Sequence, residues 1–450
     1  MFIKNLTGVA KGVFAAALFI GSFSIVSGVV LSRERLTEIL REGFSSGELS
    51  SDGEDWVEDW VECSLLTMEY IRHDSFLDAI DTNWIRPTHH TCEELKALVA
   101  GPSSTLQLDQ PSHYVNYPFG ARHFEAILLS VLSVARAKTL CLLLSYASVV
   151  CMFLGSWRNS PPVALAVVLP VGLFLIFAFE QHRYGNSLMN APSFFVGFFI
   201  LAVFLAARER YQHRANRIGF FCFIGIVTTF LDTMHGSHPV LLSITIVLNH
   251  FFYVSRGSYS SVKAYFIAAV LESFTVFLCF IVVFIVYTVI RLYILSQVIP
   301  DPVWQIFVTQ LGSRMGDVVP DVGTIHLSEV LQKLWSERSQ MTGNDFATWL
   351  FWTSGLAWLF AVSMLIFLVS RRIGNAALMV GVDVFVLMVA SLGILCWFVI
   401  FPNHSYIHAW FMVRMMALPE AYGFVAAIIV VQRWFQGKTT SRQYASLRGA

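Results

Sequence analysis

Long apolar runs, separated by short polar stretches, organise this chain. A transmembrane helix needs roughly 20 apolar residues to cross the hydrocarbon core of a bilayer. The runs are continuous and do not alternate between polar and apolar residues, which favours helices over the strands of a barrel. The pattern therefore predicts an all-α integral membrane protein with about ten transmembrane helices. We expect them at 12–31, 139–156, 162–180, 190–207, 217–233, 238–254, 264–290, 349–370, 376–400 and 412–431.

The composition agrees with this fold class and excludes others. Mean hydropathy is +0.63, with 56% hydrophobic and 13% charged residues, and these values do not suit a soluble domain. The formal net charge at pH 7 is +0. No stripe of basic and aromatic residues runs along the chain, so we expect the lipid bilayer and not a nucleic acid as a partner.

Positive charges in the short loops predict the orientation, because cytoplasmic loops carry the excess of Lys and Arg. With both termini in the cytoplasm, the short outside loops carry only Arg183. The first apolar run is longer than a usual signal-peptide core and has no small-x-small cleavage site, so we interpret it as a retained helix. The short inside loops carry Arg158, Arg208, Arg210, Arg214, Arg217, Arg256, Lys263, Arg371 and Arg372.

This orientation divides the chain into membrane regions and two extracytoplasmic segments. We expect the protein in the plasma (inner) membrane, with its functional site on the extracytoplasmic face. Cys63 and Cys92 lie in the first of these segments, where they either form a disulfide or remain two free thiols. The regions are the first helix (1–31), an extracytoplasmic segment with amphipathic and interfacial helices (32–138), a six-helix region (139–290), a second extracytoplasmic segment (291–348), a three-helix region (349–431) and a basic tail (432–450).

The first candidate cluster lies between the last two predicted spans. His404 and His408 are four residues apart, so a helix would place them on one face, and Arg414 follows inside the last span. An arginine at that depth must face protein, water or an anion, and its planar guanidinium suits a lipid phosphate. The alternative is an interfacial belt in which Arg414 pairs with Asp383. A His-x₃-His pair also binds metals, but no adjacent Glu or Cys completes a ligand set, so we predict no metal.

The second cluster is the short outside turn between the fifth and sixth predicted spans. Asp232, His235 and His238 surround Gly236, which permits a sharp bend. An acid and two histidines in one turn suit a general base and a group that orients a substrate hydroxyl. The alternative is a solvated turn in which Pro239 begins the next helix.

The third cluster lies in the first extracytoplasmic segment. One of the acids Glu62, Asp74, Asp78 and Asp81 is a candidate general base. The alternative for Asp74, Asp78 and Asp81 is that they form the solvated face of an amphipathic helix, and we therefore favour Glu62 among the four. Farther along, a short apolar helix at 126–135 is expected to lie in the membrane interface. It would hold Arg122 and His123 at headgroup level, either to meet a phospholipid-like substrate or simply as snorkelling side chains.

The chain lacks the signatures of several enzyme classes. It contains no Walker loop, no dinucleotide-binding glycine fingerprint, no zinc-protease motif and no nucleophile elbow. The segment 291–348 contains acids and a candidate helix at 327–338, and it would suit an acceptor-binding lid.

The layout resembles the polytopic glycosyltransferases of the GT-C class. The likeness rests on the first helix, the acid-bearing segment 32–138 and the later segment 291–348, and the stretch 403–414 is similar to late motifs of uncharacterised bacterial multi-span proteins. The resemblance implies a polyprenyl-phosphate sugar as donor, a glycan or lipid as acceptor, and a role in cell-envelope polysaccharide synthesis. Asp232 or Glu62 would be the base. The binding residues would be Arg414, His404, His408, His235, Arg122 and His123, with no cofactor required beyond a possible divalent metal.

Two other functions remain open. A membrane O-acyltransferase would use His235 or His404 as base and would not need the acids. A transporter or flippase for lipid-linked glycans would also span the membrane many times, but the two halves of the sequence show no repeat.

Overall fold

The chain folds into a bundle of long helices. The computed structural model describes residues 2–49, 63, 66–67, 70, 91–100, 120–179, 185–231, 236–298, 302–319, 322–341, 345–370 and 374–448. The acids Glu62, Asp74, Asp78, Asp81 and Asp232, with His235, lie outside these residues.

Long helices account for most of the described chain. In the first half they are α1 (Phe2–Val30), α2 (Arg33–Ser46), α5 (Thr91–Ala100), α6 (Gly120–Leu129), α7 (Val134–Asn159), α8 (Pro161–Val163), η1 (Ala164–Val168), α9 (Leu169–Phe177), α11 (Ala191–Ala206), η2 (Arg208–Tyr211) and α12 (Arg214–Leu231). In the second half they are α13 (Ser237–Asn249), η3 (His250–Val254), α14 (Val262–Val298), α15 (Val303–Met315), α16 (Leu327–Met341), α17 (Asp345–Ser370), α18 (Gly374–Ile400), α19 (Pro402–Ile407), α20 (Ala409–Met412), η4 (Val413–Met416) and α21 (Ala417–Arg448).

Eight of the described helices are long and apolar enough to cross a membrane. Two further apolar helices, Pro161–Phe177 and Ala191–Ala206, occupy the expected spans 162–180 and 190–207 but are shorter. The prediction of an all-α membrane protein is therefore confirmed. The eight are Asn5–Val30, Val134–Asn159, Arg214–Leu231, Ser237–Val254, Val262–Gln297, Trp349–Leu368, Leu378–Ile400 and Val413–Gln432.

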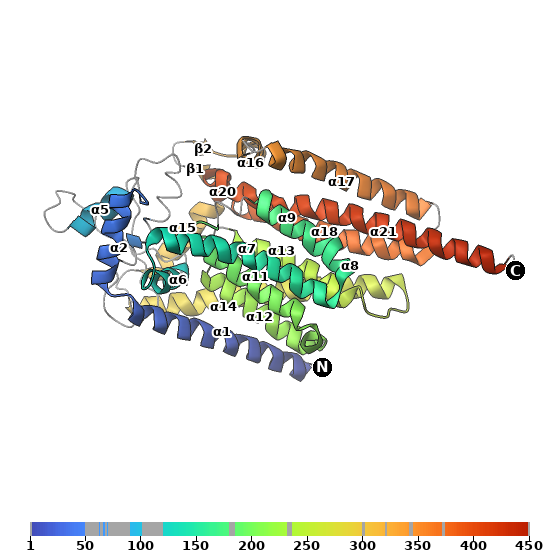
Figure 1. The fold of residues 1–450 in the computed structure, drawn as a ribbon, viewed down its shortest axis with the longest axis horizontal. Coiled ribbons are helices and arrows are strands. Elements are labelled where there is room, and N and C mark those ends of the chain that lie inside the picture. Colours follow the sequence, from blue (N-terminus) through green and yellow to red (C-terminus); the bar gives the residue numbers. More distant parts are fainter. Residues whose placement is uncertain are drawn as a thin grey trace.

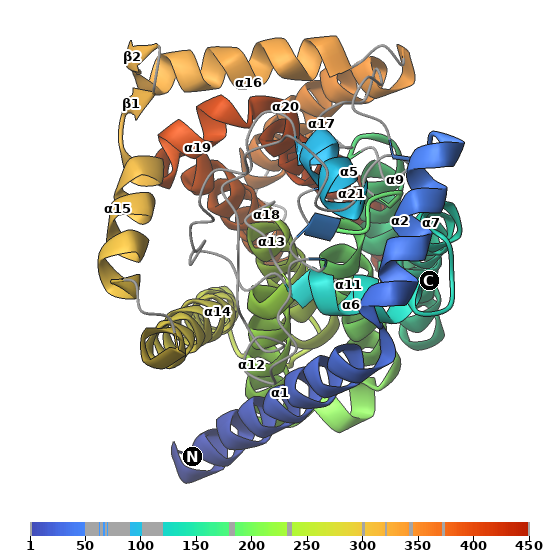
Figure 2. The ribbon, with the colours of Figure 1, turned by 90° about the vertical axis from the view of Figure 1, so that its left-hand side faces the viewer.

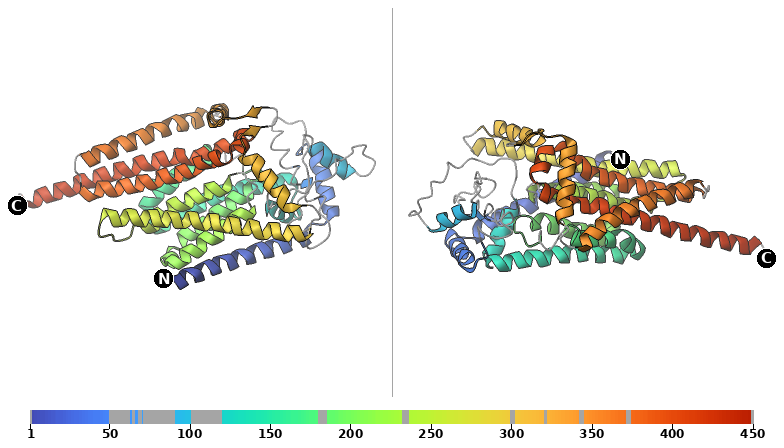
Figure 3. Two further views of the ribbon diagram at one scale, coloured as in Figure 1. Left: turned by 180° about the vertical axis from the view of Figure 1, so that it is seen from behind. Right: turned by 90° about the horizontal axis from the view of Figure 1, so that it is seen from above.

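The two ends of the bundle differ. The N- and C-termini lie at one end, which we call the terminal end, whereas α2, α5, α6, α15 and the strands lie at the other, which we call the loop end (Figure 1). The view from behind shows the same arrangement (Figure 3). Which end faces the cytoplasm stays a prediction of the positive charges in the loops.

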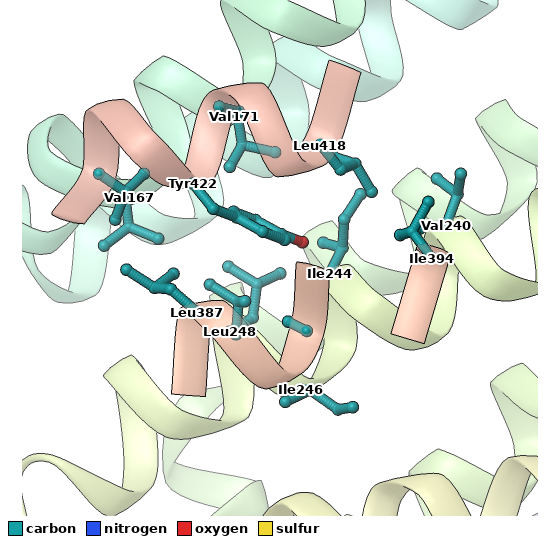
Figure 4. Packing of buried hydrophobic residues seen from close by; sticks show 14 of the residues in the cluster. Val167, Val171, Val240, Ile244, Ile246, Leu248, Leu387, Ile394, Leu418 and Tyr422 are labelled. Atoms are coloured by element: carbon teal, nitrogen blue, oxygen red, sulfur yellow. The ribbon is translucent and has the colours of Figure 1, made fainter. Parts of the chain in front are cut away.

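The core of the bundle surrounds α13. Its span is 94% buried, against 17% for the spans of α1, α14 and α17. Apolar side chains of η1, α9, α13, α18 and α21 meet around Tyr422 (Figure 4). The Tyr422 hydroxyl lies 2.9 Å from Ser243 Oγ, and Ser243 donates to the Ala390 carbonyl at 3.1 Å. These hydrogen bonds satisfy the polar groups that the apolar core encloses.

Glycines bring α1 against α12. Gly8 and Gly12 are spaced as in a GxxxG pair, and Gly219 of α12 faces them. A Cβ on Gly12 would overlap the Gly219 carbonyl oxygen, and a Cβ on Gly8 would overlap that of Ala215. The close approach fixes the first helix to the bundle, which explains why an otherwise exposed span packs here.

A small domain-like core covers the loop end beside α1. Ser32 caps α2 by accepting a hydrogen bond from the Arg35 backbone N–H at 3.2 Å. Of the two alternatives for the extracytoplasmic cysteines, the structure has the disulfide, Cys63–Cys92. The apolar core includes Leu36, Leu40, Leu95, Leu129 and Val134.

Removing this disulfide is expected to loosen the loop-end core. The bridge joins residues 29 apart in the sequence, and a crosslink of that span typically contributes about 2–4 kcal/mol by restricting the unfolded chain. We expect Cys63→Ser with Cys92→Ser to lower the unfolding temperature and to speed proteolysis of segment 32–138. Unchanged proteolysis with and without the bridge would contradict this.

One prediction about the loop segments needs correction, and one is confirmed. The helix expected at 126–135 begins at Gly120 and ends at Leu129, because Ser133 interrupts the run and precedes the first turn of α7. In the second segment the helix expected at 327–338 is α16. Helix α15 and the antiparallel strands β1 (Val318–Val319) and β2 (Gly323–Thr324), which pair Val318 with Thr324, were not predicted from the sequence.

Candidate active site at the loop end

Buried charged and imidazole side chains gather at the loop end. Arg122 and His123 are each 1% exposed, so α6 encloses them within the protein and not on its outer face. Arg414 is 3% exposed. Burying a charge is costly unless polar partners receive it, so these side chains are candidates for a functional site at this end of the bundle. Its described members are Arg122, His123 and Glu125 of α6, His238 of α13, Arg291 of α14, His404 of α19 and Arg414 of η4.

Helix α6, in the first extracytoplasmic segment, contacts the end of α12, just before the turn that carries the second cluster. Gly120 begins α6, and a Cβ there would overlap the Phe230 carbonyl, two residues before Asp232. The His123 ring stacks on Phe230 with centroids 5.7 Å apart. His123 Nδ1 also lies 2.7 Å from Ser27 Oγ of α1. The helix therefore places Arg122 and His123 beside the end of α12.

The second cluster meets the late cluster through Gly236. This glycine has φ +83°, the left-handed conformation that its role in a sharp bend predicts. A Cβ at Gly236 would overlap the side chain of Met415, the neighbour of Arg414. The chain segments that carry the three clusters are thus in contact, through Gly120 and Phe230 and through Gly236 and Met415, although they are far apart along the chain.

The late cluster is covered by the second segment. The His404 and His408 rings lie on one face with centroids 4.6 Å apart, as their spacing predicts. Asn403 donates from Nδ2 to the Val318 carbonyl, and Lys333 of α16 lies 4.4 Å from the centre of the Tyr406 ring. α15 and α16 both pack against α19.

His408 is expected to be neutral at pH 7. Loss of hydration inside the protein and the positive charge of Arg314 lower the pKa of His408 to about 4. A neutral imidazole has one donor and one acceptor nitrogen. His408 is therefore suited to orienting a hydroxyl, and not to neutralising a phosphate.

Arg414 does not pair with Asp383, so that part of the belt alternative is wrong. Asp383 Oδ1 lies 2.7 Å from His250 Nε2 and accepts a hydrogen bond from the Tyr265 hydroxyl. Asp383 is also far from Arg414, because seventeen residues of α18 separate it from Ile400, roughly 25 Å of helix.

This His250–Tyr265–Asp383 cluster was missed by sequence reasoning. It joins η3, α14 and α18 inside the membrane bundle, and η3 is a π-helical turn. Ionisable residues within apolar spans are usually paired, so Asp383 and His250 were visible as outliers in the sequence. Their pairing with each other could not be predicted from the sequence, since His250 and Asp383 are 133 residues apart.

A second missed pair fastens α16 to the bundle. Arg338 donates from Nε to Glu420 Oε1 at 3.2 Å and from Nη2 to Oε2 at 2.8 Å, and its Nη1 donates to the Ala178 carbonyl at 2.8 Å. Both side chains are buried. The bidentate pair fixes the second segment over the start of α21.

Breaking the Arg338–Glu420 pair is expected to destabilise the protein strongly. Arg338→Met leaves Glu420 buried without its partner, which typically costs about 3–5 kcal/mol. The double variant Arg338→Met, Glu420→Leu leaves no orphaned charge, so we expect it to unfold at a higher temperature than Arg338→Met alone. Equal unfolding temperatures for the two variants would show that the pair does not act as a unit.

A largely apolar cavity of about 370 Å³ lies between α13, α14 and α18. Its lining includes Pro239, Ser243, Phe274, Phe385 and Cys396. Phe274 and Phe385 are also exposed on the outside of the bundle, so the cavity adjoins the lipid-facing surface. A hydrocarbon chain is the ligand that such a lining suits.

Within the described ranges, no group of three or more His, Cys, Asp or Glu side chains is placed to hold a metal ion. No family model, curated protein or solved structure matches the chain.

Proposed function

We propose that the protein is a membrane glycosyltransferase that moves a sugar from a polyprenyl-phosphate donor to a glycan or lipid acceptor on the extracytoplasmic face. The observation that carries this proposal is the group of buried arginines at the loop end, Arg122, Arg291 and Arg414. A phosphate leaving group gains negative charge as its bond to the sugar breaks. Guanidinium groups held in a water-poor site stabilise such charge through charge-assisted hydrogen bonds.

The proposed reaction needs a base, an anion site and groups that orient hydroxyls. Asp232 or Glu62 takes the proton of the acceptor hydroxyl as its oxygen attacks the anomeric carbon. The bond from that carbon to the phosphate oxygen breaks, and polyprenyl phosphate leaves. Arg414 and Arg122 receive the phosphate, whereas His404, His408, His123 and His235 orient sugar and acceptor hydroxyls. The cavity between α13, α14 and α18 suits part of the hydrocarbon chain.

A second candidate, acyl transfer, is favoured by one observation. Ser27 Oγ lies 2.7 Å from His123 Nδ1, the arrangement of a nucleophile and its base. However, the Ser27 hydroxyl also donates to the Ser24 carbonyl at 2.9 Å, an ordinary arrangement for a serine in a helix. The glycosyl-transfer proposal explains the buried arginines, and the acyl-transfer proposal does not.

A donor panel tests the proposal. Purified full-length protein is incubated with polyprenyl-phosphate sugars and, separately, with acyl donors, and the release of polyprenyl phosphate or free carrier is measured. We expect release from one or more sugar donors and near-parental activity for Ser27→Ala. Consumption of acyl donors alone, lost in Ser27→Ala, would replace glycosyl transfer with acyl transfer.

A further inference from the structure

The second segment exposes apolar side chains where a soluble lid would expose polar ones. In Figure 2 the spans are viewed along the bundle, with α14 nearly end-on, whereas α15 and α16 are seen from the side along two edges of the loop end. The two helices therefore lie across the ends of the spans. Strands β1 and β2 lie at the corner where they meet (Figure 2). We call residues 303–338 the collar.

Only about half of the apolar side of α16 packs against the rest of the protein. Val330 and Leu334 are buried against the bundle. On a helix of 3.6 residues per turn, the apolar residues from Val330 and Leu334 to Leu331 and Trp335 cover about 140° of the circumference. Leu331 and Trp335 occupy the remainder and are 47% and 52% exposed. The polar residues Ser328, Glu329 and Gln332 occupy the other side and are exposed as well.

The same division appears on α15. Val303 is buried, whereas Trp304, Val308 and Met315 form an exposed row beside the packed side, with Val308 at 64% exposure. Thr309 projects from the polar side. At the corner, Val318 and Val322 are also more than half exposed. Both helices and the hairpin therefore turn apolar side chains toward the outside of the bundle.

This exposed surface is continuous with the lipid-facing surface of the spans. On α14 the exposed apolar residues extend to Tyr293 and Ile294, close to the start of α15. At the other end of the collar, the Trp335 ring lies 5.7 Å from that of Trp352 in the first turns of α17. Tryptophan is enriched at the boundary between membrane and water. The collar is therefore bordered on both sides by exposed apolar surface of the membrane-spanning helices α14 and α17.

We propose that the collar is a membrane-docking surface that lies in the headgroup layer at the loop end, with its exposed apolar rows inserted toward the acyl chains. An amphipathic helix in this position buries its apolar face at the boundary of headgroups and chains and keeps its polar face in water. The inner side of the collar packs on α19 and α20, so docking places His404 and His408 at the level of the lipid headgroups. This docking surface does not depend on the reaction that the site catalyses.

Spin labels on neighbouring residues test the docking surface. In a Cys396→Ser background, which removes the exposed free cysteine, the full-length protein carries Val308→Cys or Leu331→Cys and is placed in lipid nanodiscs at one copy per disc. Thr309→Cys and Gln332→Cys are the matched controls, one residue away on the same helices. Collisions of each label with oxygen, which enriches in lipid, and with a water-soluble nickel complex are measured.

We expect the labels at 308 and 331 to collide more with oxygen and several-fold less with the nickel complex than those at 309 and 332. Equal nickel accessibility at all four positions would place the collar in water and overturn the proposal. The labels at 308 and 331 could instead show low accessibility to both reagents, together with dipolar broadening between copies in detergent. That result would show that a second copy of the protein, and not lipid, covers the collar, and it would also overturn the proposal.

Discussion

Replacing the catalytic base by its amide is expected to lower the turnover rate by roughly 10²–10⁴-fold, the usual contribution of a general base. We expect this loss in either Asp232→Asn or Glu62→Gln and not in both. Both residues lie outside the described residues. Of the described residues on either side of Asp232 in the sequence, Phe230 contacts Gly120 of α6 and Gly236 contacts Met415, the neighbour of Arg414.

The matched controls are the other acids of the first segment. Asp74→Asn, Asp78→Asn and Asp81→Asn each neutralise a charge on one predicted helical face, where an exposed charge contributes little. We expect near-parental rates for all three. If every amide variant kept its activity while His235→Ala or His404→Ala abolished it, the glycosyl-transfer mechanism would give way to acyl transfer.

Arg414→Leu is expected to reduce turnover of the phosphate donor by about 10²–10³-fold, because removing one preorganised donor from an anion-stabilising site typically costs that much. Arg414→Lys keeps the charge and loses the planar fork, so we expect an intermediate loss with weaker donor binding. Both effects are measured as kcat and KM for the donor.

A structural role for Arg414 is separated from the phosphate role by two readouts. Arg35 of α2 is also an arginine at the loop end, but its side chain is 39% exposed and, among the described residues, it pairs with Glu38, so Arg35→Leu should retain parental kinetics. Arg414→Lys should express and unfold like the parent. An Arg414→Leu protein as active as the parent would remove the phosphate role.

The membrane fold could be predicted from the sequence because a continuous apolar run carries its own signal. Each expected span corresponds to an apolar helix in the structure. The spacing of His404 and His408 and the bend at Gly236 are equally local features, and both appear as predicted. In each case the residues that determine the structure are neighbours along the chain.

Pairing between distant helices could not be predicted in the same way. Asp383 is recognisable in the sequence as an acid inside a span, but its partners His250 and Tyr265 are 133 and 118 residues away, and the only partner considered for it from the sequence was Arg414, in the belt alternative. Arg338 and Glu420 are separated by 82 residues. Helix α15 was missed because exposed apolar residues such as Trp304 and Val308 lie beside its packed side, and they obscure the contrast between apolar and polar faces by which a short extramembrane helix is recognised.

We infer that the loop end, with its buried arginines, faces the outside of the cell. Impermeant thiol labelling of intact cells, in the Cys396→Ser background, measures this orientation. Ser46 is exposed at the end of α2, and Ser258 is exposed in the turn before α14 at the terminal end. The account predicts that Ser46→Cys is labelled in intact cells and that Ser258→Cys is labelled only after lysis. Labelling of Ser258→Cys and protection of Ser46→Cys in intact cells would contradict it.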